Sequence, residues 1–160
     1  MGVERGLIPS RARGDLPVIE FTIPVEAIPV QTGGKRLMIR GGRPLFFKDK
    51  RTERYYRAIA AFAARYVPPA PLEGPLEIGL IFVMARPKRL MRKADPEDRI
   101  WCPVRPDWDN LCKGVCDGLQ GFWLDDAQIV RADVEKLYAA KGENPKIHVT
   151  IRPINETQAC

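Results

Sequence analysis

The segment Leu76–Ala85 is a continuous apolar run with one early charge, Glu77, and it limits the folds that are open to the chain. The run suits a central β-strand. No apolar run in the chain approaches the ~20 residues of a membrane span, and the first residues lack the apolar region of a secretory signal. We therefore expect a cytoplasmic protein built around a sheet.

Further strands and helices are predicted on both sides of this run. The expected strands are Val18–Ile23, a hairpin of Lys35–Arg40 with Pro44–Phe47, and an antiparallel pair of Ile129–Tyr138 with Lys146–Arg152, joined near Gly142–Pro145. Apolar residues at spacings of 4, 3 and 4 predict a helix over Asp49–Tyr66, and Trp108–Leu119 is typical of a second helix. We expect one α+β domain over residues 17–153, a mixed sheet packed with two main helices. A flexible arm (1–16) precedes it and a tail (154–160) follows it.

The charge of the chain is unevenly distributed. Its formal net charge is +6, but residues 106–160 carry 9 acidic and 6 basic side chains. The rest of the chain is basic, which attracts phosphate backbones without regard to sequence. A soluble surface that happens to be basic remains an equally good account of the charge alone.

Two basic stretches are candidate DNA contacts. One lies in the long connection between Leu76–Ala85 and Trp108, since a connection of this length is commonly functional. The other lies in the first turns of the Asp49–Tyr66 helix, where cations oppose the helix dipole. The candidate residues are Arg86, Lys88, Arg89, Arg92, Lys93, Lys50, Arg51 and Arg54. A solvated helix face is the simpler account of any one cation on the helix.

Four aspartates, Asp107, Asp109, Asp125 and Asp126, lie within twenty residues of one another. On a helical wheel Asp109 and Lys113 share a polar face, while Leu111, Val115 and Leu119, flanked by Trp108 and Cys112, point to the core. An extended Asp107 at the N-cap could bring its carboxylate toward Asp109. The alternatives are an N-cap, an Asp109–Lys113 ion pair and a solvated turn at Asp125-Asp126.

Converging carboxylates repel one another unless a cation is present. Mg²⁺ and Mn²⁺ prefer oxygen ligands and keep waters for phosphodiester hydrolysis. The four cysteines lack paired CxxC spacing and His148 is the single histidine, so we expect reduced cysteines and no zinc site.

The stretch Asp107-Trp-Asp-Asn-Leu-Cys-Lys113, with Asp117 and then Gly121-Phe-Trp-Leu-Asp-Asp-Ala-Gln-Ile129, resembles the RusA family of Holliday junction resolvases. The resemblance is sharp over residues 105–131 and implies a small homodimeric, Mg²⁺-dependent endonuclease that nicks four-way DNA junctions symmetrically. It implies that Asp107, Asp109 and Asp126 are catalytic metal ligands and that Lys113 is the essential basic residue. Asp125 is then a supporting ligand, and Asn110 and Asp117 orient the others.

The chain also departs from the family pattern. The stretch Ile28–Gly34 lacks the asparagine that the family usually carries there, and residues 94–104 are extra length before the motif. Gly114 and Gly118 weaken the second helix by about 1 kcal/mol each relative to alanine, so we expect close packing against a strand or a partner as a reason for them. A flap or branched-DNA nuclease, a DNA-binding module without catalysis and a small basic structural protein remain alternative functions.

Overall fold

The computed structural model describes residues 17–30, 35–40, 43–48 and 50–154. The strands are β1 (Ile19–Ile23), β2 (Lys35–Arg40), β3 (Arg43–Lys48), β4 (Leu76–Met84), β5 (Ile100–Trp101), β6 (Ile129–Tyr138) and β7 (Lys146–Pro153). The helices are α1 (Lys50–Ala63) and α2 (Trp108–Gly118), with short 3₁₀ helices η1 (Ala64–Tyr66), η2 (Lys88–Leu90) and η3 (Asp126–Gln128). The predicted arm and nearly all of the predicted tail lie outside the described residues.

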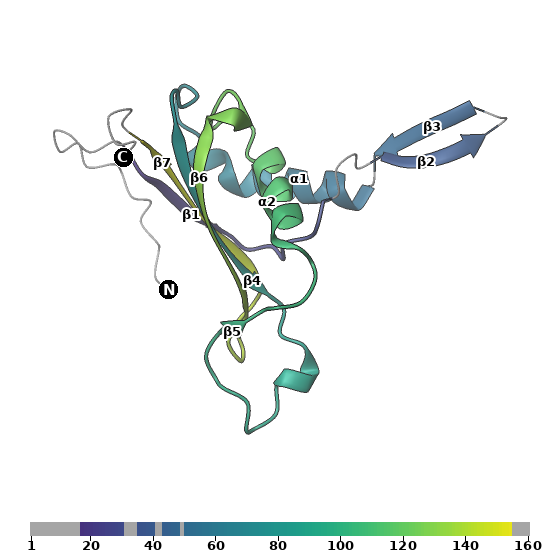
Figure 1. Cartoon of the computed structure of the whole chain (residues 1–160), viewed down its shortest axis with the longest axis vertical. Helices are drawn as coiled ribbons and strands as arrows, with labels where there is room; N and C mark the ends of the chain where they lie inside the picture. The colour runs from purple at the N-terminus through teal and green to yellow at the C-terminus, as the bar shows by residue number, and fades with distance from the viewer. Residues whose placement is uncertain (1–16, 31–34, 41–42, 49, 155–160) are drawn as a thin grey trace.

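Five strands form one mixed sheet in the order β1-β7-β4-β6-β5, and β2 pairs with β3 as a separate hairpin. Both helices lie on one face of the sheet, and the hairpin projects away from the body beside the start of α1 (Figure 1). The predicted α+β class, with two helices on a mixed sheet, is confirmed. The predicted hairpin is confirmed as well, with Lys35 opposite Lys48.

The apolar run occupies the centre of the sheet, as predicted, but the prediction of an antiparallel pair between β6 and β7 is wrong. β4 lies between them, parallel to β6 and antiparallel to β7. β4 is the most apolar strand, and it is stabilised by neighbours on both edges, which keep its backbone bonded and its side chains buried. The connection from β6 to β7 crosses the end of β4, where the Ala139 N–H donates to the Met84 carbonyl at 2.8 Å.

The core lies between the sheet and the two helices. Alternate residues of β1, β4 and β7 are buried beneath the helices, and Ile59 of α1 and Leu111 and Val115 of α2 are fully buried against them. Within the part of the chain that the structure describes, neither helix has the length and apolar character that a membrane crossing requires.

Close packing explains both glycines of α2. A Cβ at Gly118 would lie 2.9 Å from Cγ2 of Ile59, and a Cβ at Gly114 would lie 3.0 Å from Cγ2 of Val30 and 3.1 Å from the ring of Tyr55. Real Cβ atoms rarely approach other atoms so closely. The two glycines therefore let α2 approach α1 and the segment that follows β1. Close packing was predicted, but against a strand or a partner rather than against a helix and a connecting segment.

Gly118→Ala is therefore expected to destabilise the protein, although alanine is the better helix former. Overpacking against Ile59 outweighs a propensity gain of about 1 kcal/mol, and we expect a net loss on the order of 1–2 kcal/mol. Denaturant unfolding measures this loss. The same change in an Ile59→Ala background, where room exists for the new methyl group, should cost clearly less; equal losses in both backgrounds would contradict the packing account.

Candidate active site

The aspartate motif lies at the N-terminus of α2. Asp107 is the N-cap residue and is extended (φ −69°, ψ 142°), as predicted, but its side chain makes no capping hydrogen bond. Asp109 lies in the first turn of α2, and both carboxylates are exposed. Neither carboxylate has a hydrogen-bond or ion-pair partner among the residues that the structure describes, so their oxygens are available to a ligand.

Both aspartates line one hollow of the surface, which we call the Trp108 hollow. Its lining residues are Pro103, Val104, Arg105, Asp107, Trp108, Asp109 and Lys136. Trp108 differs from the wheel prediction, which placed it beside the core face: the residue is 58% exposed. It is the first residue of α2 and borders this hollow, whereas Leu111 and Val115, further along the same helix, are fully buried in the core.

Lys136 holds the wall of this hollow in place, and sequence reasoning missed it. Its Nζ donates to the carbonyl oxygens of Val104 at 2.5 Å and Pro106 at 2.7 Å. The sequence did hold a signal for it. Lys136 alternates along β6 with two apolar residues, Val134 and Tyr138, which the structure shows to be at least half-buried. A charge at such a position points to a specific partner.

Lys113 pairs with Asp117 rather than with Asp109. The Lys113 Nζ lies 3.5 Å from Oδ2 of Asp117, and the Tyr56 hydroxyl donates to the same oxygen at 2.9 Å. Burial and the hydrogen bond to Asp117 raise the pKa of Tyr56, so its hydroxyl stays protonated and remains a donor. Asp117 is therefore the shared partner of Lys113 and Tyr56 in this cluster, and its role in orienting the metal ligands stays a prediction.

Tyr56→Phe tests this cluster. Loss of the hydroxyl removes one of the two partners that fix Asp117. For the DNA cleavage that the family resemblance implies, we expect a rate roughly 10-fold lower, as for other groups that orient catalytic residues. Affinity for the four-way junction that the resemblance implies as substrate should change little. Tyr66→Phe is the matched control, because it removes a hydroxyl away from the cluster; an equal loss of rate in both variants would contradict the role of Tyr56.

Asp125 and Asp126 lie beyond the other end of α2. The Asp125 carboxylate caps η3, accepting from the Ala127 N–H at 2.8 Å within a capping box that Gln128 completes. Asp126 Oδ1 accepts from the Trp123 indole N–H at 2.7 Å, which leaves its second oxygen available. The Asp125-Asp126 turn is therefore ordered by specific contacts rather than only solvated.

The structure places the four aspartates in two groups. Asp125 and Asp126 line a second hollow with residues that include Cys116 and Trp123, and about 10 Å of helix separates Asp109 from Cys116. Among the described residues no three His, Cys, Asp or Glu side chains form a metal-binding group. Asp107 and Asp109 are the carboxylates of the motif that lie together, and a centre with all four aspartates remains a prediction.

The donor atoms near α2 fit a hard divalent ion better than a thiophilic one. Burial and the charge of Asp109 raise the pKa of Cys112 to about 11, and burial and Asp126 raise the pKa of Cys116 to about 12. Both thiols therefore stay protonated at neutral pH in the metal-free protein. The available donors are carboxylate oxygens, which suit Mg²⁺ or Mn²⁺.

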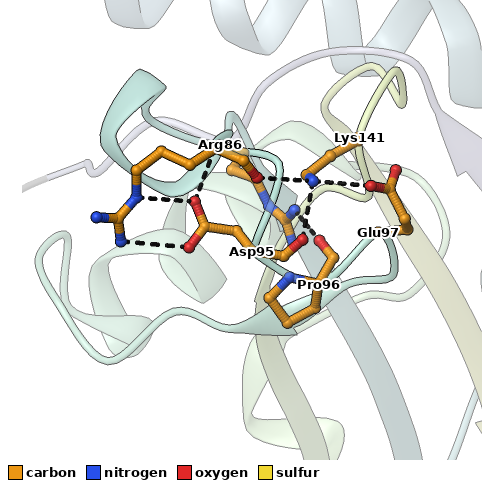
Figure 2. Close-up of polar contacts among 6 residues, drawn as sticks. Arg86, Asp95, Pro96, Glu97 and Lys141 are labelled. Carbon is orange, nitrogen blue, oxygen red and sulfur yellow. Dashed lines mark hydrogen bonds and ion pairs between the residues drawn. The ribbon is translucent and has the colours of Figure 1, made fainter.

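The connection from Arg86 to Arg105, which we call the basic loop, is held by a polar network that includes Arg86 (Figure 2). Arg86 donates to the carbonyls of Pro96 and Asp98, both at 2.6 Å, and Lys141 donates to the carbonyls of Arg92 and Asp95 and to the carboxylate of Glu97. The guanidinium of Arg86 thus stabilises the loop. Because it already donates to two loop carbonyls, it is less available for the predicted DNA contact.

The remaining DNA-contact candidates differ in availability. Lys88, Arg89 and Lys93 are exposed and have no ion-pair partner within the described ranges, whereas Arg92 forms an ion pair with Asp95 at 3.3 Å. On α1, the candidates Lys50, Arg51 and Arg54 are exposed. The loop therefore presents three available cations, and the start of α1 presents a second basic surface.

Comparison with known proteins identifies the class. Residues 26–152 match the family model described as Endodeoxyribonuclease RusA, so the chain belongs to the RusA endodeoxyribonuclease family. It is 39% identical over 77 residues to the crossover junction endodeoxyribonucleases RusA of Escherichia coli (strain K12), Shigella sonnei (strain Ss046) and Enterobacteria phage 82. The match covers 47% of this chain and 58% of each relative, a little over half of their length.

Proposed function

We propose that this chain is a Mg²⁺-dependent endodeoxyribonuclease that resolves four-way DNA junctions by paired symmetric nicks, in DNA recombination and repair. The observation that carries the proposal is the pair of carboxylates at the start of α2, Asp107 and Asp109, which have no partner among the described residues, in a chain of the RusA family. The relatives are named for action on crossover junctions, which supports the choice of substrate.

The proposed mechanism assigns the ion to the aspartates and the phosphate to the lysine. Asp107, Asp109 and Asp126 would hold Mg²⁺ or Mn²⁺, with Asp125 in support, and the ion would neutralise phosphate charge and acidify the attacking water. Lys113, whose side chain is 42% exposed, donates to a phosphate oxygen as negative charge develops there. Asp117 and Tyr56 hold that ammonium in place, and Asn110 orients the start of the helix through its carbonyl, which accepts from the Val30 N–H at 3.1 Å.

The proposed working form is a cytoplasmic homodimer. A four-way junction has approximate two-fold symmetry, so two copies related by a two-fold axis can cut two strands at equivalent positions. The basic loop of each copy and the start of α1 would contact the phosphates of the junction arms.

The experiment that tests this function compares substrates. Cleavage rates on an immobile four-way junction, a flap and a plain duplex of the same sequence should be measured in Mg²⁺. We expect the junction to be cut far faster than the flap or the duplex. Faster single nicking of the flap would favour a branched-DNA nuclease, and binding without turnover in Mg²⁺ or Mn²⁺ would favour a DNA-binding module without catalysis.

A further inference from the structure

Trp108 is an exposed aromatic residue beside the proposed metal ligands, and the proposed cleavage mechanism gives it no role. It lies between the two aspartates in sequence, is 58% exposed and lines the same hollow as both of them. Tryptophan is on average highly buried in folded proteins. An exposed indole in a hollow therefore suggests a ligand with a flat apolar face.

The hollow is a built surface rather than a loose loop. One ammonium group, that of Lys136, bonds two carbonyls of its wall and fixes the course of the chain from Val104 to Pro106. On the other side, Trp108 belongs to the first turn of α2, which Leu111 anchors in the core. The indole is thus presented between two held elements, which lowers the entropy cost of binding.

The charge of the hollow selects the part of DNA that can enter. Asp107 and Asp109 repel a phosphate wherever no cation neutralises them, but they do not repel a neutral base. Arg105 is exposed on the same lining and offers a guanidinium for stacking or for a nearby phosphate. An aromatic side chain beside a cation is the combination that binds unstacked bases, because every base has a stacking face.

We propose that the Trp108 hollow is a binding site for one unstacked nucleobase at the branch point of the DNA. The inference rests on the proposed function, because a branch point is where bases are most easily unstacked. The base stacks on the Trp108 indole and holds the adjoining phosphate beside Asp107 and Asp109. Trp108 is thereby a positioning residue that favours branched DNA over intact duplex.

Affinity measurements without divalent metal test the site while the DNA stays uncut. Trp108→Leu should weaken binding to a four-way junction roughly 5- to 100-fold, the usual effect of losing one base–aromatic stack, and should leave duplex binding unchanged. Trp108→Phe should restore most of the loss. Trp101→Leu is the matched control, because Trp101 is 68% exposed on β5 and does not line the hollow. This variant should bind the junction as the parent chain does.

Photo-crosslinking identifies the contact directly. A junction carrying 5-iodouracil at single positions should crosslink to residue 108 from a branch-point position and not from the arms, and the crosslink should be lost in Trp108→Leu. Crosslinking to other residues, or unchanged junction affinity in Trp108→Leu, would overturn the proposal. A change of oligomeric mass in Trp108→Leu would also overturn it, because the indole would then belong to a protein interface. Failure to bind or cut any junction would instead refute the proposed function.

Discussion

Asp109→Asn is expected to lower the rate of junction cleavage by about 10³-fold in Mg²⁺, because an ion held by one carboxylate fewer loses several kcal/mol of transition-state stabilisation. Junction affinity should stay within a small factor of the parent value, since the exposed carboxylate contributes no contact to the fold. Single-turnover cleavage and binding measured on the same preparation give both quantities.

The matched control is Asp98→Asn, which makes the same change of charge at another exposed aspartate. Only the carbonyl of Asp98 has a role in the loop network, so cleavage by this variant should match that of the parent chain. If Asp109→Asn retained full cleavage, the assignment of the aspartate motif as the catalytic centre would be wrong.

Replacing Lys88, Arg89 and Lys93 together by glutamine is expected to weaken junction binding by on the order of 10²-fold near 0.1 M salt. Three lost phosphate contacts should also flatten the dependence of log K on log salt by about 2.7. The loop candidates predicted from the sequence also include Arg86 and Arg92, but Arg86 donates to loop carbonyls and Arg92 is paired with Asp95, so the three available cations make the sharper set. Titration at several salt concentrations measures affinity and slope together.

Arg131 and Arg152 provide the control for net charge. Both pair with Glu77 on the sheet, away from the loop and from α2, and their replacement by glutamine should leave the salt dependence nearly unchanged. Unchanged junction affinity at low salt in the triple loop variant would contradict a role of this loop in DNA binding.

Local patterns predicted much of the fold. Apolar patterns and turn residues located both helices and every strand except the two-residue β5, because they report which faces are buried and where the chain turns. The pairing of β6 with β7 was predicted from a short glycine-containing connection and was wrong. Strand order depends on which strand takes the centre of the sheet, and the apolar strand β4 takes it between β7 and β6. A local turn pattern carries no information about this long-range competition.

The site was predicted in part. The motif and the wheel located Asp109, Lys113 and an extended Asp107, because these depend on one helix and its cap. Tyr56 and Lys136 were missed, since their partners Asp117, Val104 and Pro106 are brought to them by tertiary packing. Trp108 was placed beside the core face of the wheel, which is wrong, because the wheel could not show that the first turn of α2 borders a surface hollow.

The most direct test of the central proposal is to map nicks on all four strands of a synthetic immobile junction, with and without Mg²⁺. The proposal predicts two nicks at symmetry-related positions on opposite strands, only when Mg²⁺ is present, and ligatable duplex products. Nicks on one strand alone, nicks scattered along the arms, or equal cleavage without a divalent ion would contradict it.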